Sequence, residues 1–331
     1  FQIFKYKGLY QLRVKSHISI NRLYAETIQQ APEFQILEEL LYESCENINE
    51  LSKKLFLSSS KTQRNLKKIE SVLSGAGITL HYRPLRLEGK ESVIRHMYYR
   101  YFLEKSDRLD SLYHDLREFQ IRSITDFVNQ FIQVNRLDDQ FISRKRLGYT
   151  LFISLWRIKN GHYYLKEKLG SDLMLPDVPI LDAFKRMAME VFRLKLSADL
   201  VIDCLWLVYS DSVVSSNGQL HSAFKKGGEY IESYYRQLEL VENFDRLLSF
   251  SLGNEKKQAV TLVLLNEHRL YAPDGQLIDI LFLQRRIFLE KLAETHEQAV
   301  RKVKKIVEQF VRRHQIYQEE DFVWNYVYLL I

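Results

Sequence analysis

The chain has few of the residues that break, crosslink or anchor a protein, with 5 Pro, 12 Gly and 2 Cys among 331 residues. Few prolines and glycines beside 46% hydrophobic residues argue against long disordered stretches and fit large cores. Cys45 and Cys204 have no metal-ligand spacing and make no disulfide framework, so we expect a reduced, cytoplasmic protein whose thiols fill apolar space. No run approaches the roughly 18 unbroken apolar residues that a membrane span needs, so we expect no membrane association.

The sequence also lacks the motifs of the common catalytic sites. It has no glycine-rich phosphate loop, no HExxH pair, and no Ser or Cys in a recognisable nucleophile context. Its nine histidines are scattered, and none pairs at a metal-ligand spacing. We therefore expect no catalytic residues, no metal site and no cofactor, and we do not expect an enzyme.

Both ends of the sequence suggest a piece of a longer protein. The chain begins at Phe1 rather than at a methionine, and it stops inside the apolar run 327–331. Residues 1–14 are predicted to form a β-hairpin that turns at Lys7 and Gly8. This hairpin, with Lys5 and Arg13, is either the wing of a preceding helix-turn-helix unit or a plain edge hairpin.

Positive charge is concentrated in one segment. The net charge of the chain is +6, but residues 51–108 alone hold 13 Lys/Arg against 5 Asp/Glu. The remainder of the chain is therefore close to neutral. A basic segment joined to a neutral body favours a polyanion-binding head on a protein-binding or sensing part.

The basic segment follows helix signals with clear boundaries. Polar residues predict a helix over 20–30, and Pro32 suits the first turn of a helix over 33–43. Asn47 can cap the next helix, and Glu50, three residues later, completes a capping-box spacing. A short turn at 56–58 then leads into a further helix over 59–74, which Ser58 or Ser59 can cap.

The helix over 59–74 is amphipathic. Its apolar side is formed by Thr62, Leu66, Ile69 and Leu73, and long polar side chains lie on the other side. Gly75 and Gly77 are expected to end it through left-handed backbone torsions. Alternating residues over 78–83, a turn at Pro84 and a return over 85–87 predict a two-stranded wing. This order of parts is that of a winged helix-turn-helix, which usually reads duplex DNA.

The rest of the chain is predicted to be helical, so the fold class is mainly α. The predicted parts are a wing remnant and linker helix (1–31), the winged helix-turn-helix (32–90), a connecting helix (91–106), and two helical-bundle regulatory domains (107–216 and 217–331). Weak internal similarity between residues 197–208 and 319–330 favours a duplication of the helical part.

Candidate DNA contacts follow from side-chain chemistry. Arg64 is the best candidate for a bidentate contact to guanine, because its planar fork matches two acceptors. Gln63 and Asn65 could reach adenine, whereas the lysines and the wing cations suit phosphate. The full predicted set is Ser59, Ser60, Lys61, Gln63, Arg64, Asn65, Lys67, Lys68, His81, Arg83 and Arg86. An ordinary solvated helix face is the alternative.

Several of these stretches resemble a known family. Residues 34–38 (FQILE) and 51–58 (LSKKLFLS) are similar to the second helix-turn-helix of Mga/AtxA-type virulence transcription regulators. The similarity continues through residues 87–91 (LEGKE), and residues 157–162 (RIKNGH) resemble a segment of the first regulatory domain of that family.

This resemblance implies a transcription regulator with two helical phosphotransferase-regulation domains (PRDs). Such proteins bind double-stranded DNA, respond to a phosphocarrier protein of the sugar phosphotransferase system, and assemble as dimers or higher oligomers. His162 is carried over as a phosphorylation candidate from the Gly-His element, and His268 from a comparable Asn-x-His element. Thr150 and Trp206 stand where related antiterminators have histidines. Polar histidines near helix ends are the plainer interpretation.

We therefore predict a DNA-binding transcriptional regulator of the Mga type. One alternative is an RNA-binding antiterminator that shares the regulatory domains, although the N-terminal part has winged-helix order rather than a small all-β RNA-binding domain. Another alternative is a phosphorylation-regulated interaction scaffold that uses its winged helix as a docking surface.

Overall fold

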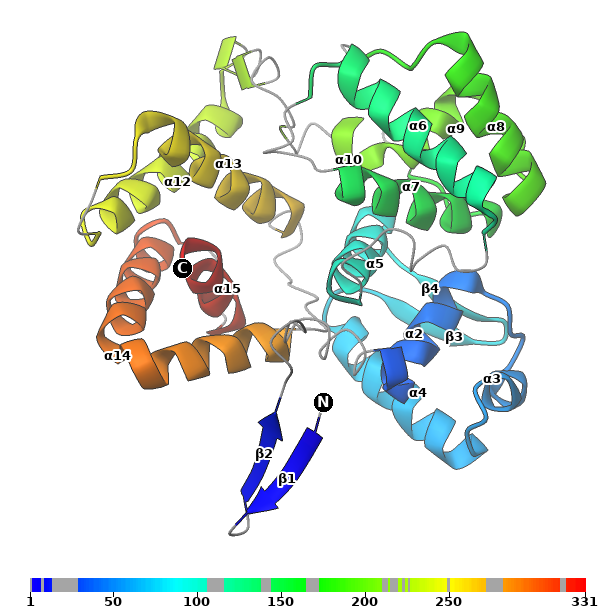
Figure 1. Cartoon of the computed structure of the whole chain (residues 1–331), viewed down its shortest axis with the longest axis horizontal. Coiled ribbons are helices and arrows are strands. Elements are labelled where there is room, and N and C mark those ends of the chain that lie inside the picture. Colours follow the sequence, from blue (N-terminus) through cyan, green and yellow to red (C-terminus); the bar gives the residue numbers. More distant parts are fainter. Residues whose placement is uncertain are drawn as a thin grey trace.

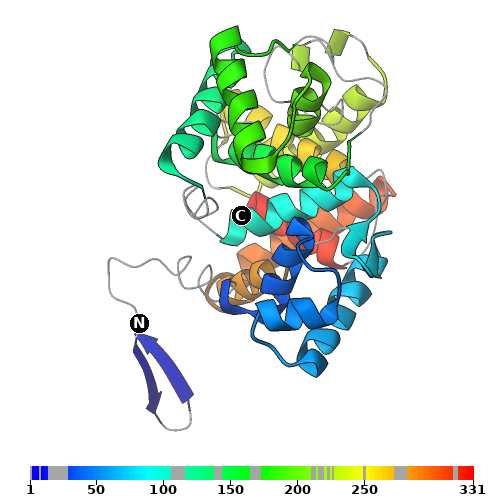
Figure 2. The ribbon, with the colours of Figure 1, turned by 90° about the vertical axis from the view of Figure 1, so that its right-hand side faces the viewer.

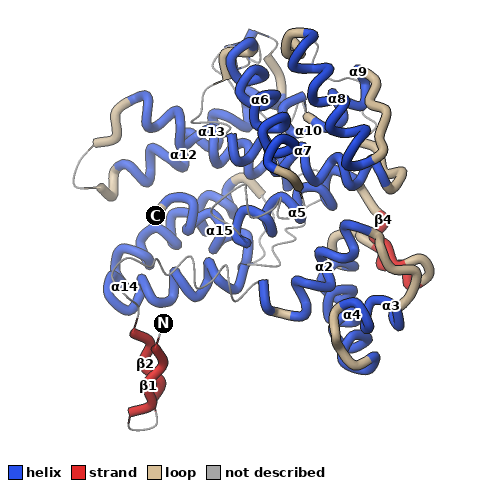
Figure 3. Tube along the Cα trace, turned by 45° about the vertical axis from the view of Figure 1, so that its right-hand side comes forward, coloured by secondary structure: helices blue, strands red, loops and turns tan. Residues whose placement is uncertain are grey.

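The computed structural model describes residues 2–6, 9–13, 29–105, 116–137, 144–164, 173–209, 214, 220–221, 224–225, 227–248, 251–271, 282–315 and 320–331 (Figure 1). Within these ranges the chain is mainly helical, and its strands form two separate antiparallel hairpins (Figure 3). The predicted mainly α fold with a helix-turn-helix region near the N-terminus is confirmed. No helix in these ranges is both long and apolar enough to cross a membrane.

The N-terminal hairpin consists of β1 (Gln2–Tyr6) and β2 (Leu9–Arg13), with Tyr6 opposite Leu9. The predicted hairpin is therefore confirmed. Its predicted turn at Lys7 and Gly8 lies outside the described residues, as does most of the predicted helix over 20–30. Lys5 is exposed.

The head of the molecule, which we define as residues 29–90, contains three helices and the second hairpin. These elements are α2 (Pro32–Tyr42), α3 (Ile48–Lys54), α4 (Ser59–Ser74), β3 (Thr79–Tyr82) and β4 (Leu85–Glu88). The Asn47 Oδ1 atom caps α3 by accepting from the backbone N–H groups of Asn49 and Glu50. The Glu50 carboxylate reaches back to the backbone N–H of Glu46 at 2.9 Å, one residue earlier than a standard capping box would place it.

The end of α4 differs in one respect from the prediction. Gly77 has the expected left-handed backbone (φ +68°), but Gly75 is still right-handed (φ −57°). The backbone N–H of Ile78 closes this turn on the Leu73 carbonyl at 3.1 Å. A single left-handed residue is sufficient here, because the six-residue closure needs only one such position.

Helix α5 (Glu91–Lys105) was predicted as a connecting helix, and the structure buries its central turns on all sides. Residues 94–102 are all buried, including Arg95, His96 and Arg100. Figures 1 and 2 place α5 between the head and the helices that follow it. The helix is therefore the centre of a shared core rather than an exposed spacer.

The first helical body packs directly on α5. It contains α6 (Glu118–Val134), α7 (Arg144–Lys159), α8 (Val178–Phe192), α9 (Ala198–Cys204) and α10 (Trp206–Tyr209). One continuous cluster of buried side chains runs from Ile36 in the head to Tyr209 in α10. Cys45 and Cys204 lie in this cluster as free, buried thiols, as expected.

The second helical body has its own cores. It contains α12 (Glu229–Asp245), α13 (Asn254–Tyr271), α14 (Phe282–Arg313) and α15 (Glu320–Leu330), and α14 is kinked at His296. Its buried side chains form two clusters separate from the first, although α13 also contacts α5. Thr150 in α7 and Thr261 in α13 are both buried and donate to the carbonyl four residues earlier. This shared feature is in keeping with a duplication, which stays a prediction, as do the domain boundaries.

Candidate nucleic-acid interface

Helix α4 has one buried and one exposed face. Thr62, Leu66 and Leu73 pack into the head, where the Thr62 hydroxyl lies 2.9 Å from that of Ser52 on α3. The Ser58 hydroxyl caps the helix by accepting from the backbone N–H of Lys61. This packing on α3 fixes the direction in which the opposite face points.

The exposed face of α4 carries most of the predicted contacts. Its exposed side chains are those of Ser59, Ser60, Lys61, Gln63, Arg64, Lys67 and Lys68. Among the described residues, Lys61, Arg64 and Lys67 form no ion pair, and Lys68 reaches Glu33 only at 3.4 Å. These cations are therefore available to an anionic partner.

Asn65 corrects the predicted set. Its side chain is only 3% exposed and lies on the buried face with Thr62 and Ile69. The 3.6-residue helical period places it three residues from Thr62 and four from Ile69, on the side that packs into the head. Asn65 is consequently not part of the exposed face of α4 that carries the other candidate contacts.

The two strands of the wing differ from its turn: His81 and Arg86 on the strands are paired, whereas Arg83 at the turn forms no ion pair with any described residue. In β3 and β4, His81 lies opposite Arg86, and both side chains bind the Glu88 carboxylate, at 2.9 and 2.5 Å. Arg83 is exposed at the turn beside Pro84. Of the three predicted wing contacts, Arg83 is thus the one directly presented to solvent, while His81 and Arg86 are half-buried and hold Glu88.

A groove of about 690 Å³ joins the exposed face of α4 to the wing. It is lined by Asn47, Ile48, Asn49, Ser59, Gln63, Lys67, Glu70, Tyr82 and Arg83. Glu70 accepts a hydrogen bond from the Tyr82 hydroxyl at 2.8 Å. Burial, together with that hydrogen bond, raises the pKa of Tyr82 to about 12. The phenol therefore stays protonated and continues to donate its hydrogen bond to the Glu70 carboxylate.

Two of these groove residues, Asn47 and Asn49, were not predicted from the sequence as part of the interface. Asn47 was assigned only a capping role, and Asn49 no role at all. The structure places the first turn of α3 against the groove, so both amides border the same surface as Gln63. No local signal in the sequence indicates that neighbourhood, because it depends on how α3 and α4 cross.

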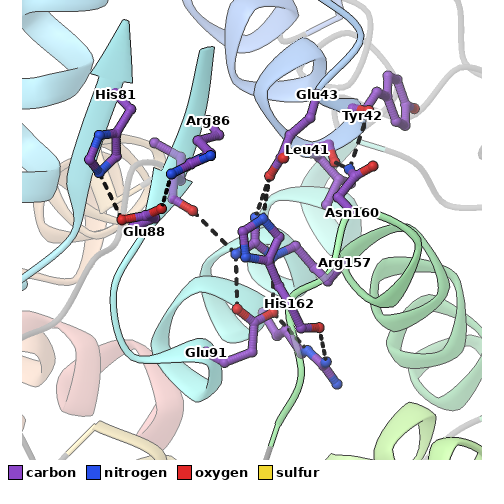
Figure 4. Close-up of polar contacts among 12 residues, drawn as sticks. Leu41, Tyr42, Glu43, His81, Arg86, Glu88, Glu91, Arg157, Asn160 and His162 are labelled. Carbon is purple, nitrogen blue, oxygen red and sulfur yellow. Dashed lines mark hydrogen bonds and ion pairs between the residues drawn. The ribbon is translucent and has the colours of Figure 1, made fainter. Parts of the chain in front are cut away.

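A buried polar cluster joins the head to the first body (Figure 4). We call Glu43, Glu91, Arg95, Arg157 and Asp203 the interface cluster. The fully buried Arg157 guanidinium contacts both carboxylate oxygens of Glu91 at 2.9 Å and the Glu43 carboxylate at 3.1 Å. It also donates to the backbone carbonyl of Leu87, at the end of the wing.

Arg95 extends the interface cluster toward α9. Its guanidinium lies 3.0 Å from Glu91 and 2.7 Å from Asp203, and it also donates to the Asp203 carbonyl. Burial raises the pKa of Asp203, and Arg95 opposes that effect. Burial also disfavours the ionised form of Glu91, but the hydrogen bonds from Arg157 and Arg95 outweigh it and hold the pKa of Glu91 below its ordinary value.

The phosphorylation candidate His162 lies at the edge of this cluster. Gly161, with φ +86°, ends α7 and lets the His162 backbone N–H bond to the Arg157 carbonyl at 2.9 Å. The His162 Nε2 atom then lies 2.7 Å from the Glu43 carboxylate of the head. The two segments 87–91 and 157–162, quoted above for their family resemblance, therefore meet at one buried site.

The second candidate, His268, is placed differently. Its backbone lies inside α13, whereas His162 follows the last turn of α7. The expected equivalence of the two positions therefore does not hold at the level of the helices. The side chain of His268 lies outside the described residues.

Comparison with known proteins supports the interpretation of the head. Residues 16–102 match the Mga helix-turn-helix domain. The chain is 26% identical over 175 residues to the capsule synthesis positive regulator AcpA of Bacillus anthracis, which covers 50% of this chain and 35% of AcpA. It is 24% identical over 299 residues to the capsule synthesis positive regulator AcpB of the same organism, covering 86% of this chain and 59% of AcpB.

The predicted resemblance to Mga-type regulators is thereby confirmed. The chain spans about a third of the length of AcpA and about three fifths of that of AcpB.

Proposed function

We propose that this chain is the DNA-binding and regulatory part of a transcriptional regulator of the Mga type. The observation that carries the proposal is the exposed face of α4, where Lys61, Arg64 and Lys67 form no ion pair within the described part of the chain. This face lies beside a wing, in a region that matches the Mga helix-turn-helix domain. AcpA and AcpB are positive regulators of capsule synthesis, and their similarity to this chain supports a role in the positive regulation of virulence genes.

In this proposal α4 enters the major groove and the wing follows the backbone. Arg64 would contact guanine through two parallel hydrogen bonds, and Gln63 would read a neighbouring base. Lys61, Lys67, Lys68 and Arg83 would contact phosphates, as would His81 or Arg86 after release from Glu88. Ser59 and Ser60, in the first turn of α4, would donate to the nearest phosphates.

The test is fluorescence anisotropy of the full chain with labelled duplexes, selected beforehand from a randomised pool, at low and physiological salt. We expect Arg64→Ala to cost about 1–3 kcal/mol on the selected site and much less on other sequences. Lys68→Ala should weaken binding equally on all sequences. It should also reduce the slope of log Kd against log salt by about one unit, the contribution of one phosphate contact. Arg301→Ala, an exposed arginine on α14, is the matched control and should change neither.

Other outcomes identify the alternatives. Equal losses on all sequences for Arg64→Ala and Lys68→Ala would refute the base contact. Tighter binding to a structured hairpin RNA than to any duplex would favour the antiterminator. Absence of binding to both DNA and RNA at low salt would favour the interaction scaffold.

We further infer that the regulatory bodies respond to a phosphocarrier protein of the sugar phosphotransferase system. The support is the position of His162, whose Nε2 atom lies 2.7 Å from Glu43 of the head. A phosphoryl group on Nε2 would bring up to two negative charges against the Glu43 carboxylate and separate the two side chains. His268 stays a second candidate, and both bodies stay candidate PRDs.

Mass spectrometry after incubation with the phosphocarrier, its kinase and phosphoenolpyruvate tests this regulatory part. We expect a phosphohistidine that His162→Ala or His268→Ala removes. Sedimentation of the same samples tests the expected dimer or higher oligomer. Unmodified protein would reject the phosphotransferase partner and leave the DNA-binding proposal intact.

A further inference from the structure

The turn between α3 and α4 contains an unusual residue, Phe56. It is 96% exposed, the highest value among the large exposed apolar side chains of the described residues. Its backbone is left-handed, with φ +53°. Each feature is unfavourable for phenylalanine, because the ring is left in water and a left-handed backbone crowds its Cβ atom.

Phe56 stands at a position that favours glycine. The backbone N–H of Leu57 bonds to the Ser52 carbonyl at 2.9 Å, and that of Phe56 to the Lys53 carbonyl at 3.3 Å. This pair of bonds is the Schellman closure of a helix, in which the left-handed residue is usually glycine. The same closure ends α7 with Gly161 and α4 with Gly77.

Other residues with positive φ in the described ranges do not share the cost of exposing a ring. They are Glu43, Arg136, Arg193 and Gln315, all with polar side chains. Phe56 is the one apolar residue in that group. A side chain that costs stability in the isolated molecule is better explained by a contact with another molecule.

The surroundings of Phe56 favour DNA over protein as that partner. Its exposed neighbours are Lys53 at the end of α3, Ser58 in the turn and Lys61 on α4. Lys54 is also exposed, but its ammonium pairs with Glu39 at 2.7 Å. Within the described part of the head, the only other large apolar side chain that is exposed is Val72, near the other end of α4. A protein-docking surface would need a contiguous apolar patch, whereas a single ring among cations suits a polyanion with apolar sugar faces.

We propose that Phe56 is a DNA-contacting residue that packs its ring on a deoxyribose at the edge of the groove entered by α4, while neighbouring lysines hold the phosphates. This inference rests on the proposed DNA binding and adds an apolar contact to it. The turn lies directly before the first residue of α4, Ser59, so docking of that helix brings Phe56 to the backbone of the duplex.

The experiment compares Phe56→Gly with the unaltered full chain on the selected duplex. Glycine relieves the left-handed strain, so we expect the melting temperature to rise by roughly 2–4 °C. Loss of the apolar contact between the ring and the deoxyribose should weaken DNA binding on the order of tenfold. Because no charge is removed, the slope of log Kd against log salt should not change, whereas Lys61→Ala should reduce it by about one unit.

Phe56→Asn and Val72→Ala complete the set. Asparagine tolerates the left-handed backbone, so it should weaken binding as glycine does. Val72→Ala removes exposed apolar surface elsewhere on α4 and should leave binding unchanged. Binding equal to the unaltered chain in both Phe56 variants would overturn the inference, leave the proposed function standing, and redirect attention to a protein partner. Failure of the unaltered chain to bind any duplex would remove both proposals.

Discussion

At the scale of single residues, Arg157 is a fully buried cation that links the first body to the head and to α5. Its guanidinium has no solvent exposure and contacts Glu43, Glu91 and the carbonyl of Leu87. Burial of a charge is unfavourable unless every donor finds an acceptor. Removal of this one cation would take away the partner that Glu43 and Glu91 share, and would leave Glu91 with Arg95 and Glu43 with His162.

We therefore expect Arg157→Met to lower the free energy of unfolding by about 3–5 kcal/mol. Urea unfolding followed by tryptophan fluorescence measures it, because Trp156 and Trp206 both lie in the first body. Arg122→Met is the matched control, since its ion pair with Glu118 is 72% and 79% exposed and should contribute less than about 1 kcal/mol. Similar small losses in the two variants would contradict this expectation and would mean that Arg95 and His162 suffice to hold Glu91 and Glu43.

At the scale of elements, three glycines between α4 and α5 have three different roles. Gly75 is right-handed, and an added Cβ would meet only the Val72 carbonyl at 3.7 Å. Gly77 is left-handed with open space around it. An added Cβ on Gly89 would lie 2.9 Å from the Gly77 carbonyl oxygen and 3.2 Å from the Ile78 Cα, both backbone atoms.

Alanine substitutions should separate these roles by thermal unfolding. Gly75→Ala should be neutral or slightly stabilising, because alanine reduces the entropy of the unfolded chain. Gly77→Ala should cost about 1–2 kcal/mol for the left-handed backbone. Gly89→Ala should cost at least as much, since backbone must move to accommodate the methyl group. A harmless Gly89→Ala would show that the wing can shift away from α4.

Local signals predicted the elements of the head well. A proline, two capping side chains and a 3.6-residue pattern place α2, α3 and α4 within a residue of their observed bounds. These signals act within one or two turns of helix, so the sequence displays them directly. Asn65 was misassigned because its polarity suggested exposure, whereas its helical position sets its burial.

Contacts between distant segments could not be predicted in the same way. The sequence offers no reason for Glu43 to meet Arg157 and His162, which lie more than a hundred residues away. The burial of residues 94–102 in α5 was also missed, because the Tyr and Arg content of this helix resembles that of a solvated connector. Both depend on how the first body packs on the head.

At the scale of the whole molecule, the head and the first body share one core, while the second body has separate cores. We expect the first two to unfold together. Leu73→Ala, in the head, should reduce amide-exchange protection in α7 as well as in α4, and should spare α14. Leu289→Ala, buried in the second body, should have the reverse effect. Loss of protection confined to the head after Leu73→Ala would contradict this coupling.

The interface cluster also limits how the head of this chain can be joined to the helical bodies of other proteins. A head transplanted together with α5 onto another body would bring Glu43, Glu91 and Arg95 without Arg157 and Asp203, and would expose the apolar side chains that pack on the first body. A working chimaera must therefore be joined beyond α10, so that the head travels with the first body as one inherited block. If α4 contacts DNA as proposed, changes of operator preference are consequently easier to acquire by point substitution on α4 than by exchange of whole heads.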